Sequence, residues 1–141
     1  MFGVVLFALI LLFYGVILSG EIVVKAFPQT KSFYKSVEET MDKGATRLFL
    51  SLGAIVVGIW NFFAPDFTAL YSPPVIGALI PSLLIIVSGT VIYPNVIEIL
   101  NIPQELKDKY YSYIEKYKGF SGIATFFAGL LHLILFRQIL F

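Results

Sequence analysis

The sequence predicts an all-α membrane protein: a bundle of four transmembrane helices built from two tandem helical hairpins. Apolar residues make up 58% of the 141 residues and charged residues 13%, with a mean hydropathy of +0.88. A soluble domain of this size cannot bury so much apolar surface. Four apolar runs, residues 2–24, 46–63, 75–100 and 120–141, are each about long enough to cross roughly 30 Å of hydrocarbon as a helix. We therefore expect one integral membrane domain over residues 1–141.

The first run, residues 2–24, is predicted to be a retained helix and not a cleaved signal peptide. No basic side chain precedes it, and it is longer than the apolar core of a signal peptide. Gly15 and Ser19 lie four residues apart, which predicts a small-residue face for a neighbouring helix. Glu21 and Lys25 follow as the polar end of this span, where they are spaced to pair.

The first polar loop, residues 26–45, is predicted to contain a short amphipathic helix. Phe33, Val37 and Met41 recur every fourth residue, and charged residues lie between them. Such a helix suits the membrane interface. Gly44 is placed to cap its C-terminus, and the second span, predicted over residues 46–63, follows at once.

The third span, predicted over residues 75–100, is the longest and contains two prolines. Pro81 and Pro94 cannot donate a backbone hydrogen bond within a helix, so both are predicted kink sites. The connection that precedes this span contains no lysine or arginine.

The second polar loop, residues 101–119, repeats the pattern of the first. An apolar stripe at helical spacing runs through it: Leu106, Tyr110, Ile114 and Tyr117. This predicts a second amphipathic interfacial helix. Gly119 is expected to end that helix and release the chain into the last span, residues 120–141.

The positions of the basic residues predict the orientation of the chain. Nine of the ten lysines and arginines lie in or beside the two polar loops, and the tenth is Arg137. By the positive-inside rule, the loops at residues 26–45 and 101–119 are expected to be cytoplasmic. Both termini and the connection between the hairpins are then expected outside the cell.

An internal duplication is also predicted. A shift of 75 residues aligns the halves without a gap, so that repeat 1 covers about residues 1–66 and repeat 2 about residues 75–141. The shift aligns Pro28 with Pro103, Gln29 with Gln104, Lys43 with Lys118 and Gly44 with Gly119. The alternative is that any inner loop favours proline at its start and glycine at its end.

Three residues are predicted to form a polar pocket in the outer half of the membrane: His132, Asn61 and Asp66. His132 is the single histidine and lies within the last span, and Asn61 falls at a similar depth in the second. Ionisable groups inside a membrane usually face the protein interior or a water-filled cavity, and a histidine suits a proton-linked step. The alternative is that His132 only hydrogen-bonds a neighbouring helix.

Charged residues near the inner surface form a second candidate cluster. Arg47 and Glu98 are predicted at matching depth, with Glu21 close by. The simpler interpretation is a fixed ion pair between spans, and the functional one is an ion or proton relay.

The remaining residues exclude several function classes. The absence of cysteine excludes disulfides and thiol chemistry. One histidine is too few for a metal site within a protomer, and no nucleotide-binding or nucleophile motif occurs. We expect no cofactor, no nucleic-acid partner and no enzymatic activity. The best hypothesis is a homo-oligomeric transporter or channel for a small solute or ion. A scaffold or subunit bound to another membrane protein is the alternative, followed by a lipid-active enzyme.

Overall fold

The computed structural model describes residues 2–63 and 79–135, and every regular element in these two ranges is a helix. The long apolar helices are α1 (Phe2–Leu18), α4 (Thr46–Phe63), α5 (Leu79–Ile92) and α6 (Gln104–Leu135). The short elements are α2 (Gly20–Ala26), η1 (Pro28–Thr30), α3 (Lys31–Met41) and η3 (Pro94–Ile99). The predicted all-α class is therefore confirmed.

The helices fit a membrane protein by length and composition. Helices α4 and α6 are each long and apolar enough to cross a membrane, and α1 with α2 makes a third span if this bent pair counts as one. Helix α5 is equally apolar but has 14 residues. The described residues thus contain two or three candidate spans.

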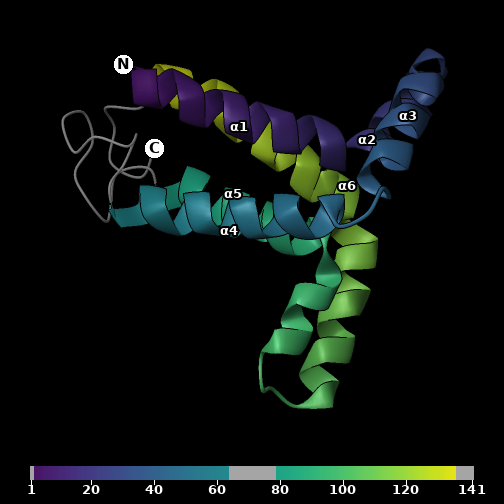
Figure 1. The fold of residues 1–141 in the computed structure, drawn as a ribbon. Helices are drawn as coiled ribbons and strands as arrows, with labels where there is room; N and C mark the ends of the chain where they lie inside the picture. The colour runs from purple at the N-terminus through teal and green to yellow at the C-terminus, as the bar shows by residue number, and fades with distance from the viewer. Residues whose placement is uncertain (1, 64–78, 136–141) are drawn as a thin grey trace.

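The long helices pack in two pairs, because α1 lies along α6 and α4 lies along α5 (Figure 1). The pairs meet chiefly where α5 contacts α6 and α1. The prediction paired each span with the next one across its polar loop, so that α1 would lie along α4. The structure corrects that pairing.

Glycines explain why α1 pairs with α6. A Cβ added at Gly15 would lie 2.5 Å from the backbone nitrogen of Phe126, and one at Gly122 would lie 2.5 Å from the carbonyl carbon of Leu18. Backbone atoms cannot move aside as side chains do, so these positions accept only glycine at this helix spacing. The predicted small-residue face at Gly15 and Ser19 is therefore the surface that contacts α6.

The α4–α5 pair is held close in the same way. A Cβ added at Gly89 would lie 2.7 Å from the carbonyl oxygen of Ser51, and one at Gly58 would lie 2.9 Å from the carbonyl oxygen of Ser82. Each pair therefore contains glycines that allow direct contact with the partner backbone.

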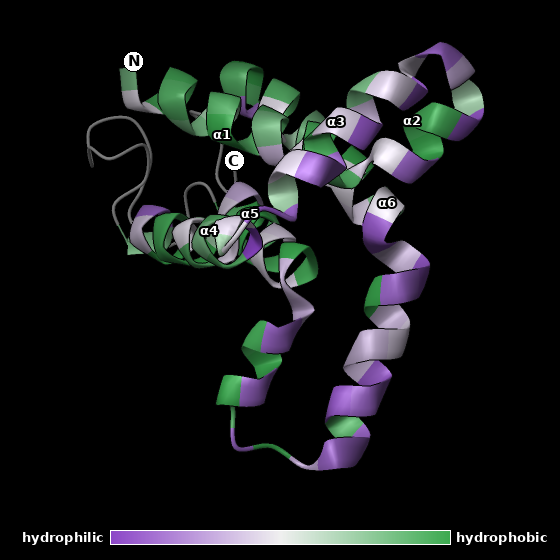
Figure 2. Ribbon diagram, turned by 45° about the vertical axis from the view of Figure 1, so that its right-hand side comes forward, coloured by the Kyte–Doolittle hydropathy of each residue, from purple (hydrophilic) through white to green (hydrophobic). Residues whose placement is uncertain are grey.

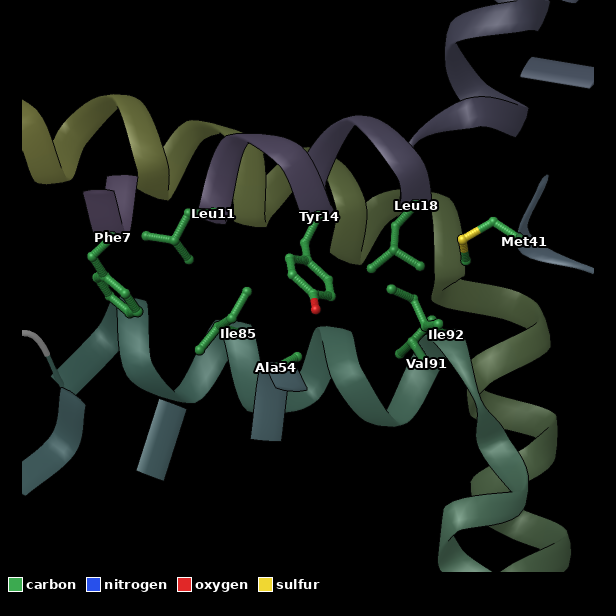
Figure 3. Close-up of a cluster of buried hydrophobic side chains, with 9 residues drawn as sticks. All are labelled: Phe7, Leu11, Tyr14, Leu18, Met41, Ala54, Ile85, Val91 and Ile92. Atoms are coloured by element: carbon green, nitrogen blue, oxygen red, sulfur yellow. The ribbon is translucent and has the colours of Figure 1, made fainter. Parts of the chain in front are cut away.

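The apolar core lies between the two pairs (Figure 3). It contains Phe7, Leu11, Tyr14, Leu18, Met41, Ala54, Ile85, Val91 and Ile92. Side chains of α1 point toward those of α5, and Met41 of α3 closes one end. The amphipathic helix predicted in the first loop is α3, and Met41 is its buried residue.

The first span ends earlier than predicted. Helix α1 stops at Leu18, and α2 continues from Gly20 at an angle of 65°. The Ser19 hydroxyl donates to the carbonyl of Val16 at 3.1 Å, a side-chain bond that favours helix bending. Tyr34 of α3 packs on Gly20, where a Cβ would lie 2.7 Å from its ring. Helix α2 therefore leaves the bundle.

The third span also ends earlier than predicted. Tyr93, with φ −131° and ψ 82°, lies outside the helical region because it precedes Pro94, and η3 begins at that proline. Pro94 therefore ends α5 and does not kink it. Pro81 lies in α5, two residues after the second described range begins. Gly77, whose carbonyl a kink would release, lies outside the described residues.

The two loop glycines behave differently. Gly44 has φ +57° and follows α3 as predicted. Gly119, by contrast, lies inside α6, which is continuous from Gln104 to Leu135. The prediction that Gly119 ends a helix is wrong. A Cβ at Gly119 would lie 2.9 Å from Ile22, so this glycine allows α2 to contact α6.

Two helical arms leave the same end of the bundle in different directions (Figure 1). The first arm is residues 20–41, and the second arm is residues 94–118, in which η3 lies beside the first half of α6. Figure 2 shows that hydrophilic residues concentrate in the arms, including the first half of α6, and hydrophobic residues in α1, α4 and α5. The molecule is thus an apolar bundle with two polar arms at one end.

Candidate functional site

Six polar side chains lie completely buried among the apolar helices, each 0% exposed. They are Ser51, Asn61, Ser82, Ser88, Thr125 and His132, and we call them the buried polar seam. They come from α4, α5 and α6. Buried polar groups cost free energy unless they are hydrogen-bonded, and inside membrane proteins they often mark functional paths.

Hydrogen bonds between described residues cross from one helix pair to the other. Ser88 of α5 lies 2.9 Å from Thr125 of α6, and the Thr125 hydroxyl donates its own proton to the Ser121 carbonyl at 2.8 Å. Ser88 must therefore donate to Thr125, since a hydroxyl carries one proton. The Tyr14 hydroxyl of α1 donates to the Leu50 carbonyl of α4 at 2.7 Å. The junction of the pairs is therefore partly polar.

The other seam contacts lie within a pair. Asn61 donates from Nδ2 to the Ser82 hydroxyl at 3.2 Å, which joins α4 to α5. His132 meets the ring of Phe7 edge to face, with ring centres 5.3 Å apart, which joins α6 to α1.

The predicted pocket of His132, Asn61 and Asp66 is therefore not an open pocket in the described part of the chain. His132 and Asn61 have no exposed surface, and Asp66 lies outside the described residues. Among the described residues, His132 contacts Phe7 of α1 and Asn61 contacts Ser82 of α5.

Ser51 is the least satisfied member of the seam. Its hydroxyl oxygen is buried without a hydrogen-bond partner among the described residues. It belongs to the turn of α4 on which Gly89 of α5 packs. A buried hydroxyl with unused hydrogen-bonding capacity can contact a polar solute or water.

The predicted pairing of Arg47 with Glu98 is corrected by the structure. Arg47 bonds Asp42 at 2.7 Å and approaches Glu38 at 3.9 Å. Glu98 bonds Lys107 at 2.7 Å. The reason is geometric: the turn at Gly44 places Arg47 beside the end of α3, whereas Glu98 belongs to η3 on the other arm.

Glu98 fastens η3 to α6 in the second arm. Hydrogen bonds from Lys107 and from the Tyr111 hydroxyl, at 2.8 Å, lower the pKa of the Glu98 carboxyl. Because the pKa of Glu98 is lower in the folded state, the contact stabilises the arm at pH values above about 4.3, the pKa of a glutamate in the unfolded chain. This stabilisation is lost as the pH falls through the folded pKa.

We expect Glu98→Gln to increase amide exchange in the first turns of α6 at about pH 7, and to have no effect once the pH lies below the pKa of Glu98. Protection factors from hydrogen exchange measure this difference. Glu115→Gln is the control, because Glu115 forms no ion pair among the described residues. An equal change in both variants would contradict the role of Glu98.

A groove of about 550 Å³ opens where the first arm joins the bundle. Its basic lining residues are Lys25, Lys31, Lys35, Arg47 and Lys118, and its acidic ones are Glu21 and Glu38. Leu18, Met41 and Ile92 are among the apolar residues that line it. We call it the basic groove. Glu21 and Arg47, predicted to lie close together, both line it.

Comparison with protein families gives one match. A model of an uncharacterised family covers residues 3–132. The chain belongs to this family. The matched range includes every residue of the buried polar seam and all the charged residues of the basic groove. No curated protein and no solved structure matches.

Most members of the buried polar seam, and the meeting of basic residues in one groove, could not be identified from the sequence. Ser51, Ser82, Ser88 and Thr125 lie in apolar runs, where single hydroxyl residues are common and carry no periodic signal. Among the basic residues of the groove, the sequence singled out Arg47 for a candidate cluster and Lys25 as a partner of Glu21, but it did not indicate that the five residues meet. Within the described residues, no group of three or more carboxylates or histidines is placed to hold a metal ion.

Proposed function

We propose that the protein crosses the membrane four times, with both arms at the cytoplasmic surface and both termini outside. The packing of α1, α4, α5 and α6 against one another supports four spans. The arms carry seven of the ten lysines and arginines, and Lys43 and Arg47 follow the first arm closely. Both arms leave the same end of the bundle (Figure 1), as the positive-inside rule favours.

The internal duplication gains support from the helix pairing. The shift of 75 residues maps α1 onto α5, α2 onto η3, and α4 onto the second half of α6. The pair α1–α6 therefore maps onto the pair α5–α4. The second span of each half therefore packs against the first span of the other half. The approximate symmetry axis runs along the membrane normal, as in transporters with parallel repeats.

The protein acts as a small transporter or channel for a small solute or ion, and it works as a homo-oligomer because four helices enclose little space. The observation that carries this proposal is the buried polar seam. An apolar junction would suffice to hold two helix pairs together. Here the junction instead contains the Ser88–Thr125 and Tyr14–Leu50 hydrogen bonds, and the unsatisfied Ser51 hydroxyl lies in the adjoining α4–α5 pair. Substrate sites of repeat-built transporters lie at such junctions.

Flux through reconstituted vesicles tests this function. Vesicles containing a pH-sensitive dye report proton entry, and light scattering reports entry of urea and glycerol. We expect Ser51→Ala to lower the conducted flux roughly tenfold while thermal stability stays unchanged, because the Ser51 hydroxyl has no partner to lose among the described residues. His132→Gln tests the proton-linked step.

The matched control is Ser112→Ala, which removes the same hydroxyl from an exposed position on the second arm. Flux equal to that of protein-free vesicles for all three probes would reject the transport function. Loss of flux in the control as well would reject the role of the seam.

A scaffold function is the second candidate, and one observation favours it. Large apolar side chains lie exposed on the arms, among them Phe33 at 54% and Tyr113 at 64%. These contact the membrane interface or another protein. Stoichiometric co-purification of one membrane protein, lost after Phe33→Ser and Tyr113→Ser, together with absent flux, would favour this function.

A further inference from the structure

We propose that the basic groove binds the phosphate group of an anionic lipid. The inference does not depend on the transport function. It starts from the composition of the groove, in which five basic residues face two acidic ones. The basic residues come from α2, α3, α4 and α6, so that the fold, and not a run of sequence, brings them together.

Three of these lysines have no ionic partner in the described part of the chain. Lys25, Lys31 and Lys118 form neither an ion pair nor a side-chain hydrogen bond there. One acid of the groove, Glu21, is likewise unpaired, and Glu38 lies near Arg47 at 3.9 Å. Like charges gathered in one concave surface repel one another, and an anion would relieve this repulsion.

Other lysines of this protein are paired with neighbouring carboxylates. Lys107 bonds Glu98 at 2.7 Å, and Lys109 bonds Glu105 at 2.8 Å. Within the groove, Lys35 lies 3.7 Å from Glu39, whereas Lys25, Lys31 and Lys118 are left available to an anion.

The apolar lining of the groove favours a lipid over a free anion. The buried side chains of Leu18, Met41 and Ile92 line its apolar part at the end of the bundle core. Tyr34 also lines it. A volume of about 550 Å³ accommodates a ligand of headgroup size. Basic pockets between membrane helices on the cytoplasmic side are suited to phosphate headgroups.

Native mass spectrometry of the purified full-length protein in detergent measures the binding. Phosphatidic acid is the probe, and phosphatidylcholine is the zwitterionic comparison. We expect phosphatidic acid to bind in preference to phosphatidylcholine. The triple variant Lys25→Gln, Lys31→Gln and Lys118→Gln should bind it at least about tenfold more weakly.

The matched control is the triple variant Lys43→Gln, Lys109→Gln and Lys116→Gln, which loses the same charge at positions that do not line the groove. It should bind within about twofold of the unmodified chain. The triple Lys→Arg variant at positions 25, 31 and 118 should retain binding, because the positive charge remains. This variant also reports on any loss of fold.

Competition by glycerol 3-phosphate distinguishes the two sources of a phosphate group. If the soluble compound competes as well as the lipid, the phosphate site stands but its ligand is a free phosphate ester. Equal binding of phosphatidic acid and phosphatidylcholine, or equal losses in the groove variant and its control, would overturn the proposal.

Discussion

Replacing Gly122 with alanine is expected to destabilise the protein by about 3 kcal/mol. The new Cβ would lie 2.5 Å from the carbonyl carbon of Leu18 and would also contact the backbone nitrogen of Ser19. Real Cβ atoms do not come so close to backbone, so α1 and α6 must separate. Separation removes contacts along the whole α1–α6 pair, where Phe7 meets His132. Thermal unfolding of the purified protein in detergent measures the loss.

Gly53→Ala is the matched control for that substitution. A Cβ there would have a single neighbour within 4 Å among the described residues, the Tyr14 hydroxyl at 3.8 Å, which is an ordinary contact. Alanine is a better helix former than glycine by roughly 0.8–1 kcal/mol, so this variant should be slightly more stable than the unmodified chain. Equal and small effects at Gly53 and Gly122 would contradict the close packing of α1 on α6.

A disulfide between Ile22→Cys and Gly119→Cys is expected to form almost completely under mild oxidation. A Cβ at Gly119 would lie 3.9 Å from the Cβ of Ile22, within the range of about 3.5–4.5 Å that disulfides require. The closer atoms of the isoleucine side chain are removed by the substitution. The chain contains no cysteine of its own, so any intramolecular bond can only join the two introduced residues.

Gel mobility without reductant, and the mass of the linked peptide after proteolysis, measure this bond. The control pair is Ile22→Cys with Gly53→Cys, since Tyr14 is the single described neighbour within 4 Å of a Cβ at Gly53. The result tests the position of α2 after its 65° bend and the place of Gly119 inside α6. Failure of the Ile22–Gly119 pair to link, or equal linking in the control, would contradict both features.

Features of the fold that depend on neighbouring residues were predictable from the sequence. The repeat of Phe33, Val37 and Met41 identifies α3, because helical periodicity is local. Gly44 adopts the positive φ expected after that helix. The prediction of a helix disruption at Pro94 gave the correct position. The predicted disruption was a kink, whereas α5 ends there. His132 and Asn61 lie inside apolar runs of the sequence, and polar residues at such positions usually face the protein interior, as both do.

The choice of helix partners was decided by the tertiary structure alone. All four runs are apolar, so hydrophobicity alone does not decide whether α1 lies along α4 or along α6. Backbone contact at Gly15 and Gly122 decides it, and such contact depends on shape matching between helices far apart in the chain. The same dependence explains the continuous α6, since the contact of Gly119 with Ile22 is invisible in either segment by itself.

The sequence by itself thus determined the all-α class, the approximate location of the apolar helices and the concentration of charge in two polar segments, because these depend on composition and local periodicity. Only the tertiary structure decided how the helices pair, which hydroxyl groups form the buried polar seam, and that lysines from separate helices meet in one groove. These features require contacts between distant segments, and a single sequence carries no local signal for such contacts.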